Sequence, residues 1–323
     1  MVERDTILDT SEQHTELLCV EIERARDYAR QARAANTRRA YRADWADFVA
    51  WCTARGASSL PSTPRTVGLY LSGLAESRKV STLQRRLSAI SQAHKSAGHA
   101  SPCQDAAVRA VFAGIRRAHG SAQRGKSPIL TAELRRMIAC LPDSVLGQRD
   151  RALLLLGFAG AFRRSELVAL DLSDVTFARE GLVVRLRQSK TDQEGHGRSI
   201  GIPYGSHPAT CPVRALQDWL EVRGAGSGPL FHPLNRHGRV LPSRLSDRAV
   251  ARVVQRTAAA VGLDPAGFGG HSLRAGLATS AAAAGVSERA IMAQTGHKSL
   301  AMVRRYIREG TLFTDNAAAA VGL

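Results

Sequence analysis

Four side chains in the last third of the chain have the chemistry needed to attack and hold a phosphodiester. His271 and Arg274 stand three residues apart, a spacing that places both on one face of a helix. His297 and Tyr306 follow towards the C-terminus. A tyrosine hydroxyl can act as a nucleophile, and a guanidinium can hold two phosphate oxygens at once. Together these residue types predict phosphodiester cleavage through a tyrosine, without a metal ion.

Two cationic side chains further upstream complete this set. Arg163 follows an apolar run, so it needs an anionic partner, and Glu166 lies three residues later. An internal Arg163–Glu166 pair with no ligand is the alternative. Lys190 is one of only five lysines among 45 basic residues. A lysine releases a proton more readily than an arginine, so Lys190 is a candidate general acid, with Lys298 as its rival.

The net charge of +17 indicates a polyanionic partner. The chain has 45 lysines and arginines against 28 acidic residues, and residues 1–125 and 126–323 both carry an excess of positive charge. Nucleic acid is the usual partner of so basic a protein, and general solubility is the alternative. Two basic lobes suit a clamp around double-stranded DNA. With the residues above, the charge predicts DNA strand cleavage through a phosphotyrosine.

The sequence also argues against several other classes of protein. The five cysteines are widely separated and form no Cys-x-x-Cys pair, which disfavours a zinc site and a disulfide framework. We therefore expect no metal and no cofactor. Residues 1–9 are charged rather than apolar, and the longest apolar run, 152–161, is too short to cross a bilayer. A cytoplasmic protein with no membrane partner, associated with the nucleoid when it binds DNA, is expected.

The first 120 residues have the apolar periodicity of helices and no alternating strand pattern. The expected helices cover 12–34, 37–53, a segment starting at 62–64, 81–97 and 105–118. They predict an all-α core-DNA-binding domain over 12–120. A polar stretch with glycine, serine and proline, 121–129, is the predicted linker.

The rest of the chain, 130–323, predicts a mixed α+β catalytic domain. Thr131 is expected to cap a helix over 132–140. Three strand patterns, two of them joined by a polar turn, predict a small antiparallel sheet from 175–177, 182–187 and 198–203. Helices are expected at 148–160, 212–223, 246–261, 272–284, 288–295 and 300–308. The fold class is therefore mainly α with a small antiparallel β-sheet.

Several segments resemble the boxes of the tyrosine recombinase (phage integrase) family in order and spacing, across residues 130–310. They are Phe-Arg-Arg-Ser-Glu-Leu-Val-Ala-Leu at 162–170, Ser-Lys-Thr at 189–191, His-Ser-Leu-Arg at 271–274, Gly-His at 296–297 and Arg-Tyr at 305–306. Stretches 285–292 and 306–308 resemble the Cre-like members most, and 81–87 with His94 resembles their DNA-reading helix. The resemblance implies a SAM-like helical domain and a tyrosine-recombinase catalytic domain that form a C-shaped clamp.

The resemblance also implies a role for each site residue. Tyr306 would form a 3′-phosphotyrosine bond, and Lys190 would protonate the leaving 5′ oxygen. His271 would assist as an acid or base. The residues that would hold the phosphate or support the pocket are Arg163, Glu166, Arg274 and His297.

Arginines that recur along helix faces are the expected DNA contacts. Positions 244, 248, 252 and 256 recur every four residues as one basic stripe. Arg248 is expected to read base edges, because 245–249 resembles a family segment that enters the major groove. The other expected groove or phosphate contacts are Arg39, Arg42, Arg85, Arg86, Arg244 and Arg252.

The family resemblance implies a homotetramer on two DNA sites, formed from a protein that is monomeric in free solution. A C-terminal helix over 314–323 is too short to be stable alone. It would dock on its own domain or, as the family implies, on a neighbouring protomer. The expected activity is site-specific recombination for integration, excision or resolution. The alternatives are a type IB topoisomerase and a catalytically silent DNA-binding regulator, although no pocket residue has been lost.

Overall fold

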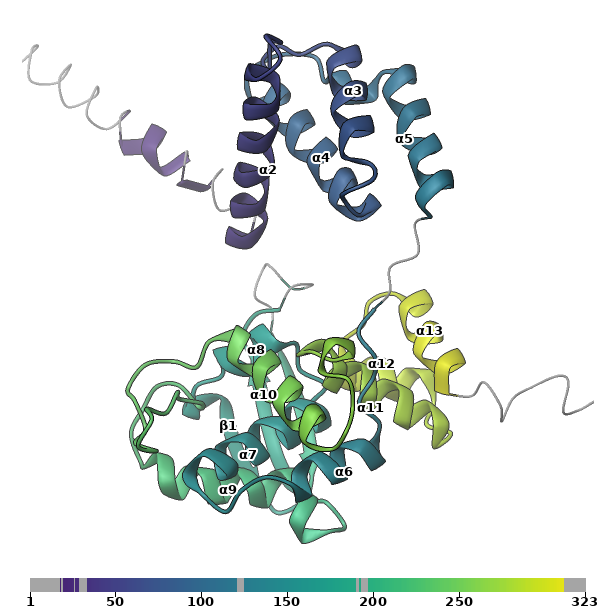
Figure 1. The fold of residues 1–323 in the computed structure, drawn as a ribbon. Helices are drawn as coiled ribbons and strands as arrows, with labels where there is room; N and C mark the ends of the chain where they lie inside the picture. Colours follow the sequence, from purple (N-terminus) through teal and green to yellow (C-terminus); the bar gives the residue numbers. More distant parts are fainter. Residues whose placement is uncertain are drawn as a thin grey trace, which may run out of the picture. The chain divides into compact units, whose positions relative to one another are not determined.

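The computed structural model describes residues 18, 20–25, 27–28, 34–120, 125–189, 192 and 197–310 of the chain. Contacts divide the chain into two compact units, one ending at Arg124 and the other beginning at Gly125 (Figure 1). The first unit is helical in its described part, and the second combines helices with a small antiparallel sheet. The predicted fold class, mainly α with a small antiparallel sheet, is therefore confirmed. The predicted linker lies partly outside the described residues.

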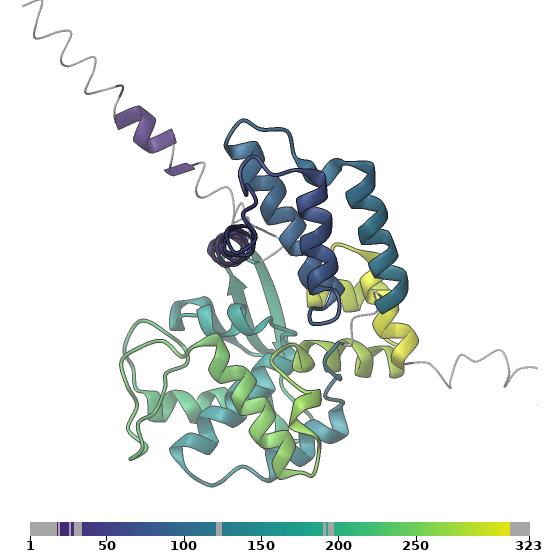
Figure 2. The ribbon, with the colours of Figure 1, turned by 45° about the horizontal axis from the view of Figure 1, so that its top comes forward.

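Four helices that lie within residues 34–120 of the first unit pack as a bundle (Figures 1 and 2). They are α2 (Ala35–Thr53), α3 (Pro64–Leu74), α4 (Val80–Ser96) and α5 (Ala106–His119). Local chemistry sets their starts, since the side chain of Thr63 accepts from the Thr66 amide and that of Asp105 accepts from the Ala107 amide. All four were predicted. The expected helix over 12–34 falls mostly outside the described residues, although 20–25 are helical.

An aromatic core joins these helices. Phe48 and Tyr70 are fully buried, with ring centroids 4.9 Å apart. His94 is also fully buried: its Nε2 accepts from the Ser62 amide at 2.9 Å, and its Nδ1 lies 2.8 Å from the Ile90 carbonyl. Since a carbonyl only accepts, Nδ1 carries the proton. His94 therefore ties α4 to the loop before α3, and it does not read DNA as its resemblance implied.

A second correction concerns Arg86, which was expected to contact DNA. Its side chain is 7% exposed, and its guanidinium bonds both the Asp47 carboxylate and the Tyr70 hydroxyl. The neighbouring Arg85 is about half exposed and donates two hydrogen bonds to Asp44, at 2.6 and 3.0 Å. Arg86 is thus a core residue of the bundle. The periodicity of the sequence could not show this, because Asp47 lies 39 positions away.

The second unit begins with three helices that lead to the sheet. Helix α6 (Thr131–Ala139) starts one residue earlier than predicted, because Glu133 accepts from the Leu130 amide at 2.8 Å and Leu130, not Thr131, is the cap. Helix α7 (Val145–Ala159) is buried over most of its length, as predicted. A short helix that the sequence did not predict, α8 (Arg164–Ala169), follows the turn after α7.

Three strands then form an antiparallel sheet in the order β1–β2–β3. They are β1 (Val175–Ala178), β2 (Gly181–Leu186) and β3 (Arg198–Pro203). Leu182 pairs with Ile202 and Val184 with Ile200, and all four side chains are buried on one face. The opposite face carries the exposed Val183 and Arg185. The predicted strand positions are confirmed, with this alternation as their cause.

The remaining helices surround this sheet and α7. They are α9 (Pro212–Arg223), α10 (Asp247–Ala260), α11 (His271–Ala283), α12 (Glu288–Thr295) and α13 (Leu300–Gly310). Helix α7 packs against α9 and α11 (Figure 1). An added Cβ at Gly276 would lie 1.8 Å from the Ile129 carbonyl oxygen, so α11 and the chain before α6 are in direct contact. The helices in the described part of the chain are all too short or too polar to cross a membrane.

Replacing Arg86 should test whether it is structural. Arg86→Ala leaves Asp47 and Tyr70 without their shared partner and should lower the free energy of unfolding by about 2 kcal/mol, less than for a fully buried pair because Asp47 is 41% exposed. Arg42→Ala, on the exposed side of α2, should change it by less than about 0.5 kcal/mol. Urea unfolding of the full chain, followed by tryptophan fluorescence, measures both. Equal stability of the two variants would contradict the assignment.

Candidate active site

The turn between α7 and α8 carries the first arginine of the site. Arg163 lies directly before α8, and its amide donates to Glu166 Oε2 at 2.9 Å. Its guanidinium donates to Oε1 of the same carboxylate at 2.5 Å. The Glu166 side chain is 3% exposed and that of Arg163 18%. The predicted pair therefore exists, and one carboxylate fixes both the backbone and the side chain of Arg163.

The same turn also holds the second arginine. Ala161 has a φ of +48°, a left-handed conformation that is unusual outside glycine. This bend directs its carbonyl to Arg274 on α11, whose NH1 donates to it at 2.8 Å. The turn thus brings Arg163 and Arg274 into one pocket, although they are far apart in the sequence.

Arg274 is fully buried, and most of its hydrogen-bonding capacity is unused. Among the described residues, its Nε and NH2 have no hydrogen-bond partner. Burial and, after it, the positive charge of Arg163 lower its pKa to about 10, while Glu166 acts in the opposite direction. The guanidinium stays charged at neutral pH, so its Nε and NH2 are well suited to bind an anion.

The tyrosine approaches this pocket from α13. The Tyr306 hydroxyl lies 3.0 Å from His271 Nε2, and Tyr306 is only 7% exposed. Its ring belongs to a small apolar cluster that is separate from the main core of the unit. The other members of this cluster are Ala275, Ala278, Ala282, Ile291 and Val303. Packing against α11 therefore holds the hydroxyl beside the histidine that could take its proton.

His297 follows α12 and completes the pocket. Its Nδ1 lies 2.8 Å from Thr295 Oγ1, and that hydroxyl donates to the Ile291 carbonyl at 2.7 Å. Because the hydroxyl has one proton, Nδ1 must carry its own and Nε2 of the neutral ring is an acceptor. Burial lowers the pKa of His297 to about 4, and the charges of Arg274 and Arg163 contribute.

The structure thus places six of the predicted residues together, which are Arg163, Glu166, His271, Arg274, His297 and Tyr306. The predicted role of Lys190 stays untested, because it lies outside the described residues. Its rival Lys298 is exposed next to His297. Within the described residues, no three His, Cys, Asp or Glu side chains could share a metal ion.

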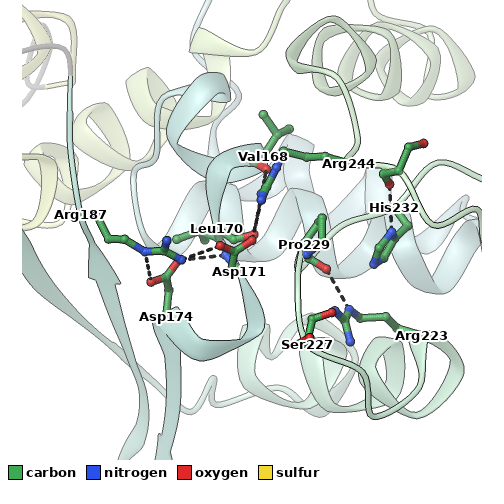
Figure 3. A network of polar contacts seen from close by, with 11 residues as sticks. Val168, Leu170, Asp171, Asp174, Arg187, Arg223, Ser227, Pro229, His232 and Arg244 are labelled. Carbon is green, nitrogen blue, oxygen red and sulfur yellow. Dashed lines mark hydrogen bonds and ion pairs between the residues drawn. The ribbon is translucent and has the colours of Figure 1, made fainter.

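The predicted arginine stripe on α10 does not form one uniform surface. Arg244 donates to the carbonyls of Val168 and Leu170 and to Asp171, as Figure 3 shows. Arg256 bonds the buried Asp150. Arg244 and Arg256 are thus paired within their own unit although they are partly exposed, and Arg248 and Arg252 between them are exposed as well. The DNA contacts of this stripe stay a prediction.

The Asp171 carboxylate has a second arginine partner. Arg187, which follows β2, bonds Asp171 at 2.6 Å and Asp174 at 2.7 Å (Figure 3). Hydrogen bonds from Arg244 and then Arg187 hold the pKa of Asp171 below its usual value. In the first unit, Arg39 bonds Asn36 on its own helix and Arg42 is exposed.

The sequence analysis did not identify one arginine of this site. Arg198, the first residue of β3, donates to the carbonyls of Ala293, Gln294 and Thr295 at the end of α12. Its position at the end of the polar turn is the only feature of the sequence that could have marked it, and many surface arginines occupy such positions. Its contacts lie almost a hundred residues away and could not be predicted.

Residues 129–311 match the model of the phage integrase family. The chain is 45% identical over 291 residues to an "Integrase/recombinase xerD homolog" of Selenomonas ruminantium, a match that covers 89% of this chain and 85% of that protein. It is 26% identical to the recombinase cre of Escherichia phage P1, over 81% of this chain and 80% of the relative.

The fold also resembles that of solved structures. One is a lambda integrase dimer bound to a core site, with a TM-score of 0.61, 21% identity, and coverage of 88% of this chain and 93% of that one. This likeness concerns the fold alone. The family match spans more than half of the chain, and the Selenomonas relative aligns with most of it. The chain therefore belongs to the phage integrase family.

Proposed function

We propose that this chain is a site-specific DNA recombinase that cleaves and rejoins strands through a 3′-phosphotyrosine on Tyr306. The observation that carries the proposal is the buried Arg274, two of whose donors have no partner in the described part of the chain, beside a Tyr306–His271 hydrogen bond. Family membership and the recombinases among its relatives support it. The net charge of +17 suits DNA as the partner.

The proposed reaction is a transesterification. The Tyr306 oxygen attacks the phosphorus while His271 Nε2 accepts its proton, and the bond to the 5′ oxygen breaks. Arg163 and Arg274 hold the non-bridging oxygens and stabilise the added negative charge of the transition state. Lys190 protonates the leaving 5′ oxygen. Rejoining reverses these steps with a 5′ hydroxyl, so the phosphotyrosine conserves the bond energy and ATP is not needed.

His297 has a more particular part in this proposal. Its neutral ring has a lone pair on Nε2, so it cannot donate to a phosphate oxygen until it gains a proton. A bound phosphodiester supplies a negative charge that favours the protonated ring. DNA binding would thus charge His297 and provide one more donor to the phosphate.

The expectations about assembly belong to the same proposal. Arg39, Arg42, Arg248 and Arg252 are exposed and suit DNA contacts, with Arg248 as the leading candidate for reading bases. The protein would close around its site as a C-shaped clamp in the nucleoid and act as a homotetramer on two DNA sites. The C-terminal segment 314–323, which lies outside the described residues, would link neighbouring protomers.

Covalent capture tests the nucleophile. Duplexes that the Tyr306→Phe variant enriches from a randomised pool supply the binding site, and a nick beside the scissile phosphate lets a short fragment diffuse away. Wild type should form a denaturation-resistant protein–DNA adduct on this substrate. Tyr306→Phe should form none, because it lacks the attacking oxygen.

An adduct that persists in Tyr306→Phe, or wild type that forms no adduct on a bound site, would overturn the assignment. Exchange of strands between two labelled sites distinguishes a recombinase from a topoisomerase. Relaxation of supercoiled DNA without any exchange would favour the topoisomerase.

Arg274→Lys tests the anion pocket. A lysine keeps the positive charge but loses the planar fork, so single-turnover adduct formation should slow by about 10²–10³-fold, as for loss of an oxyanion donor. Arg185→Lys, at an exposed arginine on β2, is the matched control and should cleave saturated DNA at a nearly unchanged rate. A fully active Arg274→Lys would show that the buried guanidinium does not hold the phosphate.

The charge on His297 can be followed directly. With ¹³Cε1-labelled histidine, NMR of the free protein should give a pKa of about 4 for His297, with His297→Asn identifying the signal. Binding of the nicked duplex by Tyr306→Phe should raise it towards or above the ordinary value of about 6.5, because the phosphate charge favours the protonated ring. A pKa that DNA leaves unchanged would exclude the proposed hydrogen bond.

A further inference from the structure

We propose that Arg198 is a positioning residue that sets the location of His297 in the pocket. This inference rests on the proposed function, because it concerns how the same site is assembled.

The guanidinium of Arg198 contacts three backbone carbonyls in the last turn of α12. Its NH1 lies 3.2 Å from the Ala293 oxygen and 3.1 Å from the Gln294 oxygen, and its NH2 lies 3.3 Å from the Thr295 oxygen.

These three carbonyls are at the end of a helix, where backbone oxygens lack partners within the helix. A cation there also complements the negative end of the helix dipole. A planar guanidinium can bond several carbonyls at once, which an ammonium on a flexible stem cannot do with the same geometry. Arg198 therefore acts as a cap for α12 that comes from another element, β3.

The next residue brings the cap close to His297. Gly296 has a φ of +65°, and a Cβ at this position would lie 2.8 Å from Arg198 Cζ. The backbone therefore adopts a left-handed turn directly against the guanidinium, and His297 is the next residue. Only glycine combines this turn with so close an approach.

The imidazole ring is fixed by the same contacts. His297 Nδ1 bonds the side chain of Thr295, whose backbone carbonyl accepts from Arg198. The guanidinium thus holds the backbone of Thr295, the residue whose side chain orients the ring of His297. Arg198 is itself partly buried, and both of its terminal nitrogens donate to these carbonyls, so in this proposal it acts through His297.

A second contact links this turn to the rest of the site. Gln294 Nε2 donates to the Ala159 carbonyl at 2.7 Å and lies 3.3 Å from the Gly201 oxygen. Ala159 ends α7, two residues before the carbonyl that bonds Arg274. The end of α12 is therefore held against both β3 and the turn after α7, which contains Arg163 and the carbonyl that bonds Arg274. Arg198 is the charged residue that makes the contact with β3.

The rate of covalent adduct formation tests the proposal. Arg198→Ala should slow single-turnover cleavage of the nicked duplex by about 10²-fold, the cost of a small displacement of a catalytic group, while DNA affinity stays within twofold. Arg198→Lys should recover part of the rate. The matched control is Arg185→Ala, an exposed arginine on β2 opposite Ser199, and its rate should equal that of wild type.

A double-variant cycle separates positioning from general damage. If Arg198 acts through His297, adding Arg198→Ala to His297→Ala should slow cleavage by less than threefold more, because the positioned group is already absent. The proposal would be overturned if the rate reduction of the double variant equalled the product of the reductions of the two single variants. It would also be overturned if Arg198→Ala cleaved at the wild-type rate.

NMR of the free protein gives a readout that does not depend on catalysis. The ¹³Cε1 signal of His297 should move in Arg198→Ala and Arg198→Lys, whereas Arg185→Ala should leave it in place. If Arg198→Ala does not fold, Arg198→Lys decides the matter: a displaced signal with slower cleavage supports the proposal, and an unchanged signal overturns it. Failure of the proposed function would instead show as wild type that forms no adduct.

Discussion

The site depends on the buried charge of Arg274. This side chain lies fully inside the second unit, and among the described residues it hydrogen-bonds the carbonyl of Ala161 alone. A buried guanidinium is costly unless an anion or a set of acceptors compensates it. The negative charge of Glu166 offsets part of that cost, and the carbonyl of the left-handed Ala161 offsets another part. The substrate phosphate would supply the rest. The free energy spent on burying the guanidinium would then be recovered when the phosphate binds.

Arginine has a second use in this protein, as a cross-link to backbone carbonyls. Arg198 bonds the end of α12, Arg244 bonds the end of α8, and Arg223 bonds four carbonyls of the loop after α9. A planar fork suits this task better than an ammonium. This explains in part why arginine so outnumbers lysine, and it means that the net charge overstates the surface available to DNA.

The sequence predicted what local patterns determine. Helix faces, the alternation in β2 and β3, and the Arg163–Glu166 pair at a spacing of three all follow from neighbours in the chain. Partners that lie far apart could not be predicted in this way. Arg86 was predicted to contact DNA, but it bonds Asp47, 39 positions away, and Arg256 bonds Asp150, 106 positions away. Burial of a charged residue depends on tertiary contacts that periodicity does not contain.

The small cluster around Tyr306 has a consequence for the dynamics of the enzyme. Its members come from α11, α12 and α13, and half of them are alanines, which bury little apolar surface. Elements with few buried apolar contacts open at a lower free energy than the whole domain. We therefore expect α13 to open locally at a lower free energy than the main core of the unit. Such an opening would take Tyr306 away from His271, so its equilibrium would set how often the tyrosine is aligned with the phosphate.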